Sequence, residues 1–306
     1  MKALVTGSAG FIGRHVVARL RSGGHDVVGL DRRPSASTDR TLDLADRRSL
    51  TGLASLLSDV DVVFHLAARP GVRDSHPHIE QIRFRDNVVA THNLFEAAPA
   101  HVAIVVTSSS SVYGGAGRMG GFVRPCRESD PLAPRGGYAT SKVEVERLSQ
   151  ERRRGGGRVS VIRPFTVVGE GQRSDMALAI WSDAIRHRRP IRLLGSPDRV
   201  RDVTDVHAVV RGLIQAASVG HDGVLNLGTG VGQRLSDLAA ALLRASGGAT
   251  EVVVADAPEE EAEITLADTT LCGQVLGFVP VTDVNAVARR VWESSVTMRR
   301  VGASAR

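Results

Sequence analysis

The stretch Thr6-Gly7-Ser8-Ala9-Gly10-Phe11-Ile12-Gly13 decides the fold of this 306-residue chain. It follows a short apolar run at residues 2–6 and opens a segment with helical spacing at residues 11–21. Glycines in this arrangement let the chain turn tightly, let the backbone approach a pyrophosphate and let a helix pack closely on a strand. The helix N-terminus then offers free N–H groups and the positive end of its dipole to phosphates. The stretch therefore predicts a strand–turn–helix unit that binds a dinucleotide.

The end of the next apolar run is a second sign of a dinucleotide. That run covers residues 25–30, and Asp31 follows it directly. A carboxylate at the end of the second strand can accept hydrogen bonds from the adenosine ribose hydroxyls, and its charge repels a 2′-phosphate. We therefore expect NAD as the cofactor, while the adjacent Arg32 and Arg33 keep NADP open as an alternative.

Strand and helix patterns alternate through the first half of the chain. Apolar runs at residues 60–66, 102–107 and 158–162 are typical of buried strands. Residues 78–98 and 138–152 have helical spacing. The apolar runs are nearly continuous, as in parallel strands that are covered on both faces. The sequence predicts an α/β fold with a Rossmann-type, doubly wound parallel sheet, followed by a smaller and less regular C-terminal α/β region.

Composition narrows the class of protein. With 42% hydrophobic residues the chain can form a sizeable core, and no apolar run approaches the roughly 20 residues that span a membrane. The net charge is +6, but the basic residues are spread along the chain and few aromatic residues could stack on bases, so we expect no nucleic acid partner. Cys126 and Cys272 lack metal-ligand or redox spacing, and the N-terminus lacks a signal-peptide pattern. We expect a cytoplasmic protein with no metal ion and no membrane attachment.

Tyr138 and Lys142 are the candidate catalytic pair. They lie four residues apart in a predicted helix, so their side chains share one face. A free phenol has a pKa of about 10, too high for an efficient base at neutral pH. A nearby ammonium group and a positive nicotinamide ring stabilise the phenolate and lower this pKa. The pair therefore predicts proton abstraction by Tyr138.

These motifs together resemble the extended, sugar-nucleotide branch of the short-chain dehydrogenase/reductase superfamily, the NAD-dependent epimerase/dehydratase family. The resemblance makes Ser109, in the serine-rich stretch at residues 107–114, the hydroxyl partner of Tyr138. Lys142 would also bind the nicotinamide ribose. The cofactor-binding residues that the resemblance implies are Gly7, Gly10, Phe11, Ile12, Gly13, Asp31, Asp43, Leu44, Leu66, Ala67, Ala68, Asn87, Tyr138 and Lys142.

The two residues after Ser109 indicate the reaction. In the family, 4,6-dehydratases carry Asp-Glu there and UDP-glucuronate decarboxylases carry a Glu, whereas this chain has Ser110 and Ser111. Neither hydroxyl can act as a carboxylic acid, which disfavours dehydration and decarboxylation. The resemblance then implies 4-epimerisation through a transient 4-keto sugar, with Tyr138 removing the C4 hydroxyl proton. A decarboxylase, and a cofactor-bound regulator without chemistry, remain as alternatives.

Two further segments of the chain indicate an acidic sugar. Gln172-Arg173-Ser174-Asp175-Met176-Ala177 and Pro70-Gly71-Val72-Arg73 resemble segments of UDP-glucuronate 4-epimerases. Thr166 stands where galactose-type epimerases carry Asn, so an epimerase of a neutral UDP- or dTDP-hexose is the nearest alternative. The substrate-binding residues implied are Arg73, Ser110, Ser111, Thr166, Arg173 and Arg201. The run at residues 259–263 departs from the family's Arg-Pro-Gly-Asp turn, and we carry over no contact from it.

The resemblance also implies how the chain is divided. Residues 1–165 would form the NAD-binding domain, with residues 201–222 returning to it. Residues 166–200 and 223–306 would form the domain for the nucleotide sugar. The expected partners are NAD and a UDP-sugar, most of all UDP-glucuronate, and a homodimer is the candidate assembly.

Overall fold

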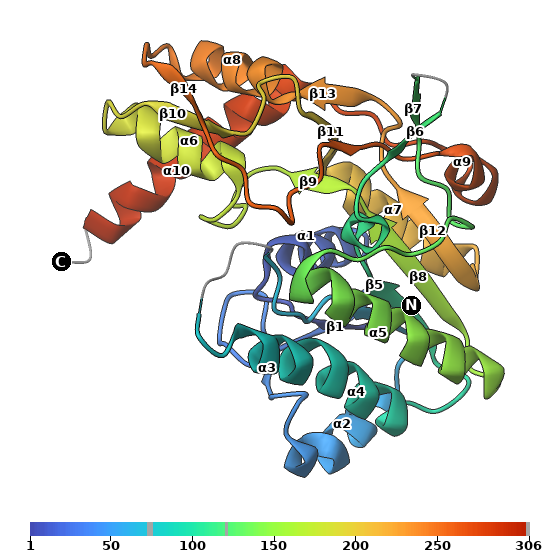
Figure 1. The fold of residues 1–306 in the computed structure, drawn as a ribbon. Coiled ribbons are helices and arrows are strands. Elements are labelled where there is room, and N and C mark those ends of the chain that lie inside the picture. The colour runs from blue at the N-terminus through green and yellow to red at the C-terminus, as the bar shows by residue number, and fades with distance from the viewer. Residues whose placement is uncertain (72–75, 120–121, 304–306) are drawn as a thin grey trace.

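A seven-stranded parallel sheet forms the centre of the molecule (Figure 1). The structure is a computed structural model that describes residues 1–71, 76–119 and 122–303, with side chains of the last helix described to residue 296. Every neighbouring pair of strands in this sheet is parallel. In sheet order the strands are β12 (Gly223–Leu227), β8 (Val159–Pro164), β5 (Ala103–Thr107), β4 (Val62–His65), β1 (Lys2–Thr6), β2 (Asp26–Asp31) and β3 (Arg40–Thr41).

Helices cover both faces of this sheet, which confirms the predicted doubly wound arrangement. One face is covered by α1 (Phe11–Ser22), α7 (Val206–Ser218) and α9 (Thr270–Leu276). The other carries α2 (Leu50–Leu57), α3 (Ile79–Arg83), α4 (Ala90–Ala97) and α5 (Gly136–Arg154). Each face has its own buried apolar cluster, because the central strands are apolar on both sides.

A smaller α/β region lies at one end of the sheet, at the top of Figure 1. Its own core is formed by three helices and a parallel strand pair. These are α6 (Ala177–Arg186), α8 (Leu235–Ser246), α10 (Val284–Ala303), β10 (Ile191–Leu194) and β14 (Val252–Ala255). A second small sheet combines β9 (Thr166–Val168), β11 (Val200–Asp205), β13 (Gly232–Arg234) and β15 (Ile264–Thr265).

The expected division of the chain needs one correction. Residues 223–306 were assigned to the sugar-binding part, yet β12 (Gly223–Leu227) pairs with β8 in the central sheet. Helix α9 also packs on that sheet through Cys272 and Leu276. The run 223–227 is short and apolar, and such a run fits either sheet equally well, so only the observed pairing places it.

Three further elements differ from the sequence prediction. The helix expected at residues 78–98 is continuous but contains a π-helical turn, η2 (Phe84–Val89), between α3 and α4. Helix α10 runs on to Ala303, a long terminal helix that was not predicted. A hairpin of β6 (Gly117–Met119) and β7 (Phe122–Arg124) was not predicted. In the described part of the chain, no helix is long and apolar enough to cross a membrane.

Candidate active site

The glycine-rich turn connects β1 to α1 and leaves no room for side chains. Gly7 has a φ of 71°, and a Cβ atom there would lie 2.6 Å from the backbone nitrogen of Ala67. A Cβ atom on Gly13 would collide with the Gly7 carbonyl oxygen. Gly10 precedes the first turn of α1, whose N–H groups therefore face the turn. The backbone thus forms a close cradle at a helix N-terminus, the geometry that a pyrophosphate requires.

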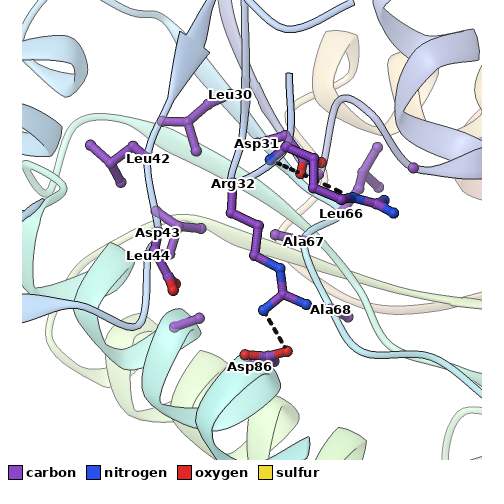
Figure 2. Close-up of a pocket in the computed structure, with 14 residues that line it drawn as sticks. Leu30, Asp31, Arg32, Leu42, Asp43, Leu44, Leu66, Ala67, Ala68 and Asp86 are labelled. Atoms are coloured by element: carbon purple, nitrogen blue, oxygen red, sulfur yellow. Dashed lines mark hydrogen bonds and ion pairs between the residues drawn. The ribbon is translucent and has the colours of Figure 1, made fainter. Parts of the chain in front are cut away.

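A pocket extends from this turn along the carboxyl ends of the strands (Figure 2). Eight of the predicted cofactor residues line it, namely Gly7, Gly10, Asp31, Asp43, Leu44, Leu66, Ala67 and Ala68. Phe11 and Ile12 instead pack beneath the turn against the core of the central sheet. Leu30, Arg32, Arg33, Leu42, Asp86 and Ala90 also line the pocket. Of these, Leu42, Asp86 and Ala90 belong to no recognisable motif, so they were not predicted.

Asp31 is held rigidly at one end of this pocket. Its carboxylate accepts hydrogen bonds from the backbone N–H groups of Ala9, at 3.0 Å, and Arg33, at 2.9 Å. Arg32 extends across the pocket in Figure 2 and pairs with the buried carboxylate of Asp86 at 2.8 Å. The Arg32 guanidinium is therefore already engaged by an acidic partner, which favours NAD over a cofactor with a 2′-phosphate.

Tyr138, Ser109 and Lys142 lie near the end of β5. The Ser109 hydroxyl lies close enough to the Tyr138 phenol to lower its pKa. Lys142 lies one helical turn after Tyr138 in α5, is only 4% exposed, and donates from Nζ to the Thr107 carbonyl oxygen at 2.8 Å. Asn87 lies in the π-helical turn and donates from Nδ2 to the Ser141 hydroxyl at 2.8 Å, so it packs against the same helix.

Burial controls the ionisation of this pair in the protein alone. It raises the pKa of Tyr138 above its usual value, while Arg173, the Ser109 hydrogen bond and Arg83 act in the opposite direction. Burial lowers the pKa of Lys142 to about 8, opposed by the Glu146 carboxylate one turn further along α5. The protein's own groups therefore do not bring the phenol pKa to neutrality, and the positive nicotinamide expected beside it would supply the remaining stabilisation.

Three of the predicted substrate-binding residues, Ser110, Ser111 and Thr166, lie just after strands of the central sheet. Ser109 precedes a short 3₁₀ helix, η3 (Ser110–Tyr113), and its hydroxyl accepts a hydrogen bond from the Ser111 N–H at 3.1 Å. The Ser111 hydroxyl is buried and has no hydrogen-bond partner among the described residues. Thr166 begins β9, two residues after β8 reaches the same edge of the sheet.

Two of the three predicted arginines, Arg173 and Arg201, form ion pairs with acidic side chains of the chain itself. Arg173 binds Asp175 through two hydrogen bonds of 2.9 and 3.2 Å, and its charge acts on Tyr138. Arg201, in β11, pairs with Glu261 at 3.0 Å. Arg73 lies outside the described residues. The sequence did not identify Arg83, a buried side chain that hydrogen-bonds Glu80 at 2.9 Å and acts on the Tyr138 pKa.

One polar cluster lies apart from these residues. His15, Glu170 and His207 bring three potential metal-ligand atoms within 4.8 Å of one another, although the sequence predicted no metal. The Glu170 carboxylate is already bound by His207 at 2.6 Å and by Arg290 at 3.0 Å. These two basic groups, with the backbone N–H of Glu170 itself, outweigh burial and hold the Glu170 pKa at about 2. The Glu170 carboxylate therefore links α7 to α10, while His15 of α1 contacts the Glu170 backbone carbonyl at 3.2 Å.

Comparison with known proteins agrees with this geometry. The profile of the NAD dependent epimerase/dehydratase family matches residues 3–228, most of the chain. The chain belongs to this family. As a member of the epimerase/dehydratase family it is an NAD-dependent enzyme, which confirms the cofactor predicted from Asp31 and the glycine-rich turn.

Relatives within the family divide over the sugar. An uncharacterized UDP-glucose epimerase of Bacillus subtilis is 31% identical, over 93% of this chain and 94% of its own. A probable UDP-glucuronate 4-epimerase of Rhizobium meliloti is 32% identical, over 72% of this chain and 69% of its own. Among solved structures, MoeE5 superposes with a TM-score of 0.86 at 36% identity, covering 98% of this chain and 100% of MoeE5. It was solved with NAD and either UDP-glucuronic acid or UDP-glucose.

Proposed function

We propose that this enzyme is an NAD-dependent 4-epimerase of a nucleotide sugar, and that its substrate is UDP-glucuronate, which it converts to UDP-galacturonate. The family and the relatives support the reaction, because the family is NAD-dependent and the relatives are named as epimerases of UDP-sugars, one of them as a probable 4-epimerase. The choice of an acidic sugar depends on residues of this chain. The nearest alternative is the same reaction on a neutral UDP-hexose.

The residues of the cofactor pocket fit NAD. The close approach of Gly7 and Gly13 to neighbouring backbone leaves a side-chain-free surface for a pyrophosphate. Asp31 also lines the pocket, and its carboxylate is placed to bind the adenosine ribose. Bound there, NAD would accept a hydride from C4 of the sugar and return it to the opposite face. Lys142 would hold the nicotinamide ribose, and its ammonium would favour the phenolate of Tyr138.

Tyr138 and Ser109 supply the proton transfer in this proposal. The Tyr138 phenolate takes the proton of the C4 hydroxyl, and Ser109 shares that hydrogen bond through its contact with the phenol. When the sugar has turned over, Tyr138 returns the proton to the C4 oxygen. No carboxylic acid stands after Ser109, since those positions are Ser110 and Ser111, so the 4-keto sugar meets no acid from them that would drive elimination.

The buried hydroxyl of Ser111 is the observation that favours an acidic sugar. A buried donor without a partner costs free energy, about 1 to 3 kcal/mol, unless a ligand satisfies it. The Ser111 N–H donates to the Ser109 hydroxyl, which contacts the catalytic phenol. A ligand atom that forms a hydrogen bond with the Ser111 hydroxyl would therefore lie near the reacting carbon. Several hydroxyl donors can orient a carboxylate without neutralising it. Orientation matters here, because the 4-keto form of a hexuronate is a β-keto acid that can lose carbon dioxide.

The deciding experiment compares UDP-glucuronate with UDP-glucose and resolves the products by NMR. The proposal expects epimerisation of UDP-glucuronate to be faster, with little pentose product. A preference for UDP-glucose would leave the neutral-sugar epimerase, and UDP-pentose as the main product would identify a decarboxylase.

Two serine variants sharpen this experiment. Ser111→Ala should slow the reaction of UDP-glucuronate roughly 10- to 100-fold, because one charge-assisted hydrogen bond contributes about 1.5 to 3 kcal/mol. Ser160→Ala is the matched control, since the Ser160 hydroxyl is also buried without a described partner but lies at the beginning of β8, at the opposite end of the strand from Pro164. Its rate should stay close to wild type. If both variants behave alike, Ser111 has no special role toward the sugar.

Thr166→Ala tests the second carboxylate ligand through the product. A carboxylate that is less firmly held in the β-keto intermediate should leave more often as carbon dioxide. We therefore expect a pentose by-product beside the epimer, together with a rate loss of about one order of magnitude. A neutral-sugar epimerase would show neither effect, and Thr166→Asn would hardly disturb it.

A further inference from the structure

The acidic run Glu259-Glu260-Glu261-Ala262-Glu263 lies against the predicted nucleotide site. This run replaces the turn that the family usually has here, and no function was assigned to it from the sequence. In the structure, Glu261 forms an ion pair with Arg201 at 3.0 Å. The two side chains are only 11% and 12% exposed, so water screens this pair much less than a surface pair.

Backbone pairing fixes the acidic run beside Arg201. The strand β15 begins at Ile264, directly after Glu263, and its Thr265 is in register with Arg201 of β11. Arg201 donates from one terminal nitrogen to the carbonyl oxygens of Val200 and Glu263. The other terminal nitrogen donates to the Glu261 carboxylate. The two carbonyl groups cannot move without breaking the small sheet, whereas the Glu261 side chain can rotate away.

The same run reaches the catalytic helix. A Cβ atom on Gly136, two residues before Tyr138, would lie 3.2 Å from Cγ of Glu260. A Cβ atom on Gly115, just after η3, would lie 3.2 Å from Cβ of Ala262. Residues 260–262 therefore lie between the end of η3 and the start of α5, which carry the catalytic hydroxyls. A nucleotide that contacts Arg201 must take the place that Glu261 now holds.

We propose that Glu261 is a specificity-determining residue of the nucleotide site, an internal anion that occupies Arg201 until a diphosphate displaces it. This rests on the proposed function in taking a UDP-sugar as the substrate and Arg201, one of the predicted substrate-binding residues, as a ligand of its diphosphate, and it does not depend on the sugar. The carboxylate and a phosphoryl group compete for the same guanidinium nitrogen. Displacing Glu261 costs binding free energy. Inorganic phosphate cannot offset this cost, because it lacks the contacts that the rest of a nucleotide sugar makes. Glu261 thereby keeps the arginine for complete nucleotides.

Calorimetric titration of the NAD-loaded enzyme with UDP tests this inference. Glu261→Gln removes the competing charge, so UDP should bind about tenfold more tightly than to wild type, a change of about 1.4 kcal/mol. Inorganic phosphate should then compete with UDP in the variant and have little effect in wild type. Equal or weaker UDP binding by Glu261→Gln would overturn the inference, because Glu261 would then only support Arg201.

Three further variants separate the contact from the charge. Glu259→Gln changes the net charge equally, in an exposed side chain of the same run, and should bind UDP as wild type does. Glu261→Asp keeps the charge but shortens the side chain, and should bind UDP more tightly than wild type. In an Arg201→Gln background, Glu261→Gln should change nothing, since the competition needs the arginine. A gain in Glu259→Gln, or one that persists without Arg201, would overturn the inference.

These readouts are independent of the sugar. If UDP-glucuronate proves not to be the substrate while Glu261→Gln still gains affinity for UDP, the inference stands and the proposed substrate fails. If UDP-glucuronate is epimerised and Glu261→Gln gains nothing, the inference fails alone.

Discussion

The cofactor pocket and the sugar side of the site are prepared in different ways. On the cofactor side, the backbone makes the site: the Gly7 turn presses against Ala67, and Asp31 is held by two backbone N–H groups. On the sugar side, the two predicted arginines that the structure describes have long side chains, and both already hold acidic partners. Arg173 is bound to Asp175, and Arg201 to Glu261.

This difference suits the two ligands that the proposed reaction needs. A hydride that leaves and returns requires a cofactor that stays, and a rigid backbone cradle loses little conformational entropy when it binds. A substrate and product must exchange at every turnover. Arginines that trade an internal carboxylate for a phosphate can release the product without leaving buried charges unpaired.

Tyr138, where the two sides meet, should give the largest effect. Tyr138→Phe removes the proton acceptor, so turnover should fall toward the upper end of the range of about 10²- to 10⁴-fold for general acid–base groups. Ser109→Ala should cost less, because the phenol keeps its own oxygen. NAD content and UDP affinity should stay close to wild type in both, since the backbone cradle and Arg201 are untouched. A Tyr138→Phe enzyme with wild-type turnover would contradict the assignment.

Gly13→Ala should weaken NAD binding without changing the residues on the sugar side of the site. Its methyl group would collide with the Gly7 carbonyl oxygen. Because that oxygen belongs to the backbone and cannot rotate away, the turn must shift. We expect loss of most bound NAD after gel filtration and about 1 to 3 kcal/mol of lost stability. Gly52→Ala, in α2, is the control, since its nearest neighbour would be a Leu42 methyl group at 3.9 Å. Full NAD retention in Gly13→Ala would show that the cradle is less rigid than its contacts indicate.

Glu170→Gln should give the smallest effect, on stability and its pH dependence. The Glu170 pKa is depressed from 4.5 to about 2, so its ion pairs stabilise the fold above pH 4.5 and are lost as the pH falls toward 2. Near neutral pH the variant should be less stable by about 1 to 2 kcal/mol, reduced from the full value of the shift because the group is partly exposed.

Urea unfolding at pH 7 and pH 4 measures this difference. The gap between wild type and Glu170→Gln should narrow at the lower pH, because the Glu170 carboxylate of the unfolded wild-type chain, with its usual pKa of 4.5, takes up a proton there and the unfolded state gains stability. Glu251→Gln is the control, an exposed carboxylate with no hydrogen bond or ion pair recorded in the described residues. A gap that is as wide at pH 4 as at pH 7 would show that charge is not what Glu170 contributes.

The sequence predicted the cofactor side well and the sugar side less completely, for a physical reason. The glycine turn, Asp31 and the Tyr138–Lys142 pair depend on short spacings within one strand or helix, and such spacings are visible in the chain. The place of β12, the small sheet around β11 and the contact of Glu261 with Arg201 depend on pairings between distant segments. No local pattern distinguishes an apolar run that joins β8 from one that joins β14. The π-helical turn at Asn87 is likewise a result of packing rather than of helical spacing.

The path of the chain between its two parts has a consequence for how such enzymes diversify. The central sheet includes β12 and is covered by α7, both from beyond residue 200. The strand β9 and the helix α6, which lie between β8 and α7 in the chain, belong to the smaller region. No single cut yields a continuous gene segment that encodes one part whole. Recombination that exchanges one continuous segment would therefore leave a sheet edge unpaired or expose a hydrophobic core. If the proposed function holds, a lineage on this scaffold would acquire a new sugar by point substitutions at positions such as Thr166 and Ser111.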